Sequence, residues 1–107
     1  MITTLDYANW LAEGKLRFGG DLMDFTFVCP VCQYEQSARE CIEAGMESGA
    51  IGFSCIGRWL PPEQIKKGPP GPCHYAGGGL FKLNPIRVRM PDGTELPMFA
   101  FAAKAKQ

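Results

Sequence analysis

The fold of this chain is decided by the stretch Cys29-Pro30-Val31-Cys32, a tight turn with a cysteine at each end. Two further cysteines, Cys55 and Cys73, arrive singly from distant parts of the sequence. A turn that aims two thiolates at one point, completed by two separate thiols, is typical of a closed tetrahedral metal site rather than of a set of disulfides. We therefore predict a structural zinc ion bound by Cys29, Cys32, Cys55 and Cys73. Because these four ligands would fill the coordination shell, no position remains for an activated water.

Three residues near these cysteines are open to more than one interpretation. His74 could take the place of Cys73 as a ligand, but adjacent residues rarely both reach one small ion, so a solvated loop histidine is favoured. Cys41 is better explained as a small buried hydrophobic residue. Arg58 follows Cys55 by three residues and is a candidate counter-charge for four thiolates around one divalent ion.

The length of 107 residues and the hydrophobic fraction of 46% indicate one globular unit, and we predict a single zinc-binding domain over residues 1–107. The chain has 13 glycines and 9 prolines, which build turns rather than a core, so a metal ion would add stability that a small interior lacks.

The start Met1-Ile2-Thr3-Thr4 has neither the basic nor the apolar part of a secretory leader. We therefore expect a cytoplasmic protein with reduced thiols. No membrane contact is expected, since no apolar stretch approaches the roughly 18 residues of a spanning helix.

Periodicity and capping residues predict two short helices. The first is capped by Thr3 or Thr4 and ends at Gly14 or at Gly19-Gly20. The second begins at the capping box Ser37-Ala38-Arg39-Glu40, after which apolar residues recur at helical spacing.

Strands are predicted over residues 25–28, 50–56, 80–90 and 95–101. The last two flank Pro91-Asp92-Gly93, which predicts a C-terminal hairpin because proline presets φ and glycine accepts the left-handed position. Residues 57–79 contain five prolines and six glycines and are predicted to form a long irregular loop that metal binding would hold. The predicted fold is an α+β domain with two short helices and a small, mainly antiparallel sheet.

The formal net charge of zero conceals an uneven distribution along the chain. Residues 1–57 carry three basic and eight acidic side chains, whereas residues 58–107 carry eight basic and three acidic ones. The basic half could contact nucleic acid through Arg87 and Arg89 on one strand face, with Lys82 nearby and Trp59 and Tyr75 as stacking platforms. The favoured interpretation is that the two halves pair their charges at the surface and that both aromatic residues pin the loop.

Thiol redox chemistry is the enzymatic alternative, because a strand, C-P-V-C and a helix form a glutaredoxin-like arrangement in which a helix N-terminus lowers the pKa of the first thiol. Here four residues separate Cys32 from the helix signal at Ser37, which is too far for the helix dipole to act on Cys29. Redox catalysis is therefore disfavoured, and a non-enzymatic role is preferred.

Motifs spread over the chain resemble those of one protein family: Trp10-Leu11-Ala12-Glu13-Gly14, Phe27-Val28-Cys29-Pro30-Val31-Cys32, Ser37-Ala38-Arg39, Gly52-Phe53-Ser54-Cys55-Ile56-Gly57-Arg58, Cys73 and Gly78-Gly79-Leu80-Phe81. Over nearly its whole length the chain is similar to small, uncharacterised phage- and prophage-encoded proteins with a four-cysteine, zinc-knuckle-like site. The resemblance implies a phage origin and a zinc-binding role for the four cysteines, and it implies no activity.

The resulting hypothesis is a non-enzymatic phage protein that binds or inhibits a host protein complex, such as a defence system, in the bacterial cytoplasm. The sequence has a single histidine, no evident nucleophile with a base and no paired carboxylates, so no small-molecule substrate is expected. Acidic residues in the first half could mimic nucleic acid, although ordinary solubility charges also explain them. A nucleic-acid-binding regulator that uses the basic second half is the competing hypothesis.

Overall fold

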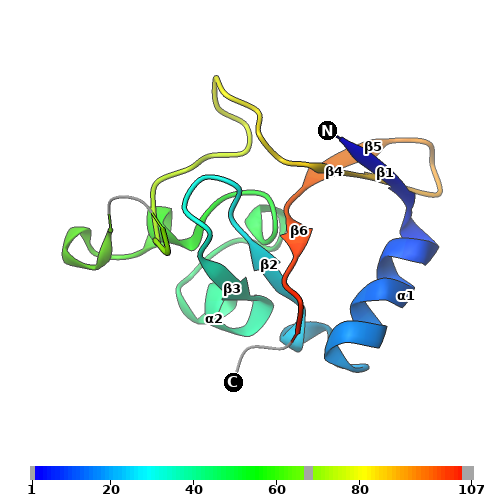
Figure 1. Cartoon of the computed structure of the whole chain (residues 1–107), viewed down its shortest axis with the longest axis horizontal. Helices are drawn as coiled ribbons and strands as arrows, with labels where there is room; N and C mark the ends of the chain where they lie inside the picture. Colours follow the sequence, from blue (N-terminus) through cyan, green and yellow to red (C-terminus); the bar gives the residue numbers. More distant parts are fainter. Residues whose placement is uncertain (1, 67–68, 105–107) are drawn as a thin grey trace.

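The computed structural model describes residues 2–66 and 69–104, which contain short helices and strands joined by long connections (Figure 1). The α-helices are α1 (Tyr7–Phe18) and α2 (Ala38–Glu43), and the strands are β1 (Thr3–Asp6), β2 (Thr26–Val28), β3 (Glu35–Ser37), β4 (Ile86–Arg89), β5 (Glu95–Met98) and β6 (Ala100–Phe101). Short 3-10 helices cover Leu22–Asp24, Ser48–Ala50, Ile56–Trp59 and Pro62–Gln64. The predicted α+β class with two short helices is confirmed.

Two three-stranded sheets divide the strands between them. In the first sheet, β4 lies between β1 and β5, parallel to β1 and antiparallel to β5. In the second sheet, β2 lies between β3 and β6 and is antiparallel to both. In Figure 1, α1 lies on one side of β6, whereas β2, β3 and α2 lie on the other. The predicted, mainly antiparallel pairing is therefore present, but it is distributed over two sheets.

The C-terminal hairpin forms as predicted and joins β4 to β5. Gly93 has a φ of 92°, in the left-handed region that favours glycine, and the Asp92 carboxylate accepts a hydrogen bond from the Thr94 N–H at 3.0 Å. The strand predicted after this turn is divided at Phe99, whose side chain is fully buried and whose N–H donates to the Gly52 carbonyl at 2.6 Å. The chain thereby leaves the first sheet and enters the second one as β6.

Aromatic side chains from α1 and the second sheet form the centre of the hydrophobic core. The ring centroid of Trp10 lies 5.2 Å from that of Phe101 and 5.9 Å from that of Phe25. Phe18 lies 5.7 Å from Phe25. α1 approaches β2 closely because Gly14 has no side chain, and a Cβ there would overlap the Phe25 ring. The core therefore holds α1 against β2 and β6.

Both helices agree with the sequence prediction in part. The capping box of α2 is confirmed, since the Glu40 N–H donates to the Ser37 hydroxyl at 3.1 Å and the Glu40 carboxylate accepts from the Ser37 N–H at 2.8 Å. α1 ends before Gly19, one of the two predicted ends. It begins at Tyr7 rather than after a threonine cap, because the preceding residues pair with β4 as strand β1.

One predicted strand, residues 50–56, is wrong, and another, residues 80–90, is too long. Residues 50–56 form no strand, because the N–H groups of Phe53 and Ser54 both donate to the Ala50 carbonyl at 3.0 Å and fold the segment into a turn. The strand predicted over residues 80–90 is confined to β4, and residues 80–83 are exposed. The predicted loop of residues 57–79 is irregular over its described part, apart from the two 3-10 helices near its start.

Within the described ranges, no helix combines the length and the apolar character that crossing a membrane requires.

Candidate metal centre

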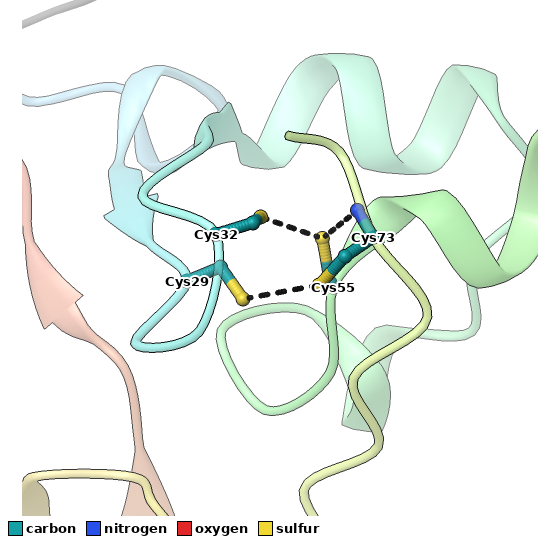
Figure 2. Close-up of side chains that lie close together, drawn as sticks. All are labelled: Cys29, Cys32, Cys55 and Cys73. Carbon is teal, nitrogen blue, oxygen red and sulfur yellow. Dashed lines mark hydrogen bonds between the residues drawn. The ribbon is translucent and has the colours of Figure 1, made fainter. Parts of the chain in front are cut away.

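The four predicted ligands lie together in one cluster. The sulfur atoms of Cys29, Cys32, Cys55 and Cys73 are all within 4.8 Å of one another, and Figure 2 shows their side chains converging from separate segments. The Sγ atoms of Cys29 and Cys73 are 3.8 Å apart, as are those of Cys32 and Cys55. Sulfurs placed about 2.3 Å from a central zinc ion in a regular tetrahedron would be about 3.8 Å apart. The observed spacing therefore fits the predicted ion.

The turn between β2 and β3 positions the first two cysteines. The Cys29 N–H donates to the Tyr34 carbonyl and the Gln33 N–H donates to the Cys29 carbonyl, both at 3.0 Å, and Gln33 takes a left-handed φ of 66°. These hydrogen bonds close the turn over the cluster. The backbone N–H groups of Val31 and Cys32 face the Cys29 sulfur, where they favour a thiolate.

Two irregular segments position Cys55 and Cys73 by backbone hydrogen bonds. The Cys55 N–H donates to the Tyr75 carbonyl at 3.0 Å. The Cys73 N–H donates to the Cys55 sulfur and the Tyr75 N–H donates to the Cys73 sulfur, both at 3.4 Å. The segments also touch at Gly57, where a Cβ would overlap the Cys73 carbonyl oxygen. Backbone donors thus point at sulfur in both halves of the site.

Gln36 positions Cys55 and was not singled out from the sequence. Its side chain is fully buried; its Nε2 donates to the Ser54 carbonyl at 3.0 Å, and its Oε1 accepts from the Ile56 N–H at 2.8 Å. Ser54 and Ile56 flank Cys55, so one amide holds the residues on both sides of this ligand. In the sequence, Gln36 is only a polar residue in the middle of a three-residue strand. The pattern of such a short strand does not show whether this side chain points into the core or toward solvent.

The electrostatics of the cluster favour a bound cation. The hydrogen bond with Cys55, together with burial, raises the pKa of Cys29, and burial raises the pKa of Cys73 to about 12. The hydrogen bond with Cys29 lowers the pKa of Cys55 to about 5, against the effect of burial. Without a cation, sulfurs this close retain protons because they cannot all carry charge. A divalent ion would instead compensate several thiolates at once.

The raised pKa of Cys29 and the position of α2 oppose the alternative of thiol redox catalysis. A reactive first thiol needs a lowered pKa, commonly at a helix N-terminus. α2 begins only at Ala38, and the pKa of Cys29 is raised.

The three other residues considered near the site, His74, Cys41 and Arg58, are not part of the sulfur cluster. His74 is exposed, and the clustered set contains Cys73 instead. Cys41 is fully buried within the hydrophobic core, as predicted. The Arg58 guanidinium lies over the Trp59 ring, 5.6 Å from its centroid, and makes no ion pair within residues 2–66 and 69–104.

The two strand arginines differ in their surroundings. Arg89 forms ion pairs with Asp6 at 3.5 Å and with Glu95 at 3.4 Å, so one acidic residue of the first half meets one basic residue of the second. Arg87 is half-buried on the same face of β4. The predicted pairing between the two halves is therefore seen at Asp6 and Arg89.

A family model described as VVA0879-like matches residues 6–102, a range that includes all four clustered cysteines. Comparison with curated proteins and with solved structures gave no match. Because the family model spans most of the sequence, the chain belongs to the VVA0879-like family.

Proposed function

We propose that this protein is a single zinc-binding domain in which Cys29, Cys32, Cys55 and Cys73 hold one structural zinc ion. The observation that carries this proposal is the convergence of four sulfurs within 4.8 Å of one another, with two of the pairs 3.8 Å apart, close to the edge of a zinc–thiolate tetrahedron. The donor set supports it too, because four thiolates select zinc or iron over hard cations such as magnesium. With four protein ligands the ion has no open position, so it serves the fold rather than a hydrolytic reaction.

Metal analysis of protein produced without added zinc tests this site. We expect one zinc ion per chain in the wild type and in Cys41→Ser, a matched control that changes a buried cysteine outside the cluster. Cys29→Ser should lose the ion or bind it far more weakly. Replacement by cobalt(II) should give the strong visible absorption of tetrahedral thiolate coordination, and Cys29→Ser should weaken it. Iron in place of zinc, or equal metal binding by both variants, would contradict the proposal.

The zinc-supported domain acts as a non-enzymatic binding protein in the cytoplasm of a bacterial host. Its motifs resemble those of phage-encoded proteins, which supports a phage origin and a host protein complex, such as a defence system, as the target. The single histidine lies exposed and outside the sulfur cluster, which supports a role without acid–base catalysis. The partial pairing of Arg89 with acidic neighbours leaves less free positive charge on β4 for nucleic acid.

A pull-down from bacterial lysate separates the protein-binding role from the nucleic-acid alternative. The full chain is used as bait with and without nuclease treatment. A defined protein partner that survives nuclease treatment and is lost with Cys29→Ser supports the proposal. Loss of all partners after nuclease treatment would favour a nucleic-acid-binding regulator instead.

A further inference from the structure

The four clustered cysteines differ in how far solvent can reach them. Cys29 and Cys55 are 0% exposed and Cys32 is 1% exposed, whereas Cys73 is partly exposed. Three of the sulfurs are thus closed to a dissolved molecule, and the fourth is open to one. The oxidation of cysteine follows thiolate character and access, so an oxidant that reaches the cluster reacts with Cys73 first.

A second sulfur lies next to the accessible one. Cys29 Sγ is 3.8 Å from Cys73 Sγ, and the same distance separates Cys32 Sγ from Cys55 Sγ (Figure 2). Each of these pairs joins the turn between β2 and β3 to another segment, unlike the Cys29–Cys32 pair that thiol redox catalysis would use. An accessible cysteine beside a second cysteine is typical of thiols that are oxidised reversibly to a disulfide.

Tyr75 connects the cluster to the loop before β4. Its N–H donates to the Cys73 sulfur at 3.4 Å, and its carbonyl accepts from the Cys55 N–H at 3.0 Å. Its hydroxyl accepts a hydrogen bond from the Leu83 N–H at 2.8 Å. A movement of Cys73 therefore disturbs the backbone of Tyr75 and, through its side chain, the hydrogen bond to Leu83.

Residues 80–83 have little else to hold them. Leu80 is 89% exposed and Phe81 is 71% exposed, and in Figure 1 this yellow segment projects from the body of the molecule. Among residues 2–66 and 69–104, the hydrogen bond from Leu83 to Tyr75 is the one that ties residues 80–83 to the rest of the structure. The order of this loop thus depends on where Tyr75 lies.

We propose that the metal centre is a redox-sensitive switch, in which hydrogen peroxide converts Cys73 and Cys29 to a disulfide, the ion is released and residues 80–83 are freed from Tyr75. The inference rests on the proposed zinc site. The Cys73 thiolate attacks one peroxide oxygen, so an S–O bond forms, the O–O bond breaks and hydroxide leaves. The Cys29 thiolate then attacks the Cys73 sulfur, so an S–S bond forms, the S–O bond breaks and a second hydroxide leaves. The two thiolates supply the two electrons that reduce the peroxide.

The disulfide changes both the ligand set and the position of Cys73. Only Cys32 and Cys55 remain as thiolates, and two ligands are too few to retain the ion. An S–S bond is about 2 Å long, so Cys73 and Cys29 must approach each other from their present separation of 3.8 Å. The Tyr75 N–H then loses its thiolate acceptor, which transmits the change to the loop.

Addition of hydrogen peroxide to the full-length, metal-loaded protein tests the chemistry. A chromogenic chelator should detect about one zinc ion for each Cys29–Cys73 disulfide found by mass spectrometry, and dithiothreitol with zinc should restore the starting state. Dimedone, which traps sulfenic acid, should label Cys73. Cys41→Ser, which removes a buried cysteine outside the cluster, should release zinc as the wild type does.

Cys73→His tests whether the accessible sulfur starts the reaction. Three cysteines and one histidine are a common zinc ligand set, so this variant should keep the ion but release it at least about tenfold more slowly in peroxide. If Cys73→His does not bind zinc, the position of the dimedone label in the wild type decides the same point.

Hydrogen exchange at the Leu83 amide tests the connection to the loop. Exchange should be faster in the oxidised wild type than in the reduced one. Tyr75→Phe removes only the hydroxyl acceptor, so it should give fast exchange in the reduced protein while zinc is retained.

Three results would overturn the switch and leave the zinc site standing: zinc retained after the thiols are oxidised, a Cys29–Cys32 disulfide as the first product, or exchange at Leu83 that oxidation does not change. Metal analysis before peroxide is added tests the zinc site separately. A protein that contains no metal ion would overturn both proposals.

Discussion

Gln36 illustrates how much of the candidate site depends on residues outside the cysteine cluster. The cysteines themselves are recognisable from their spacing, because a tight turn with a cysteine at each end and two further single cysteines are typical of a tetrahedral metal site. Gln36 is recognisable only in three dimensions, where its amide bridges the backbone on both sides of Cys55. Its role depends on which face of β3 is buried, and a strand of three residues is too short to show that by alternation.

Replacing Gln36 with leucine should lower the free energy of unfolding by about 2–6 kcal/mol. Two buried backbone groups, the Ser54 carbonyl and the Ile56 N–H, would lose their partner, at about 1–3 kcal/mol each. Urea unfolding of the metal-loaded protein measures the loss. Gln64→Leu is the control, since Gln64 is exposed and its replacement should change stability by less than about 0.5 kcal/mol. Equal stability of the two variants would exclude this role for Gln36.

Gly57→Ala should weaken the metal site without changing any ligand. A Cβ at this position would overlap the Cys73 carbonyl oxygen, so the Cys73 segment must move away from Cys55. We expect a loss of about 1–3 kcal/mol in the free energy of unfolding, the usual effect of overpacking, together with faster transfer of metal to a competing chelator. Gly49→Ala is the control because no atom lies within 4 Å of a Cβ built there. A Gly57→Ala protein that retains metal as the wild type does would show that the two segments are not rigidly packed.

At the level of elements, the capping box and the hairpin turn were predicted reliably, whereas strands that depend on a distant partner were not. The capping box of α2 and the turn at Gly93 depend on neighbouring residues, and both form as predicted. β1 exists only because it pairs in parallel with β4, from the opposite end of the chain, and nothing in its own sequence shows this partner. The segment before Cys55 has the residue types of a strand, but it lacks a partner strand and folds into a turn instead.

The packing of α1 on β2 leads to a prediction in which two effects oppose each other. Alanine is favoured over glycine in a helix by about 0.8–1.0 kcal/mol, so propensity alone would make Gly14→Ala stabilising. A Cβ there would overlap the Phe25 ring, which is 2% exposed and packed against Trp10 and Phe18, at a cost of about 1–3 kcal/mol. We therefore expect net destabilisation.

Thermal unfolding measures the sign of this effect. Gly20→Ala is the control, since a Cβ at Gly20 meets no atom within 4 Å and Gly20 lies outside α1. A higher melting temperature for Gly14→Ala than for the wild type would mean that the Phe25 ring can move aside.

At the level of the whole molecule, the sulfur cluster connects three parts of the chain that are far apart in the sequence. Cys29 and Cys32 lie in the turn between β2 and β3 of the second sheet, Cys55 follows the turn at residues 50–54, and Cys73 lies in the long loop. The clustering of these four cysteines could be predicted from the sequence, because residues able to bind a metal ion are recognised by type and spacing. The sequence did not predict the division into two sheets, since that depends on one buried residue, Phe99, at which the chain passes from the first sheet to the second.

Metal binding should release protons, and its affinity should rise with pH. The raised pKa values of Cys29 and Cys73 keep both thiols protonated at neutral pH in the metal-free protein, whereas Cys55, with a pKa of about 5, is already ionised. A bound ion must displace at least these two protons, so affinity should increase at least about 100-fold per pH unit near pH 7. Calorimetric titration with zinc in buffers of different ionisation enthalpy counts these protons. Release of fewer than two would contradict the protonation states described above.

Thermal unfolding with and without the metal ion tests the central claim most directly. If a zinc ion bound by four sulfurs supports this fold, removal by a strong chelator should release about one ion per chain and lower the melting temperature by at least about 10 °C. A shift of this size corresponds to a loss of only about 2 kcal/mol for a domain of this length. An unchanged melting curve, with no metal recovered in the chelator fraction, would contradict the account.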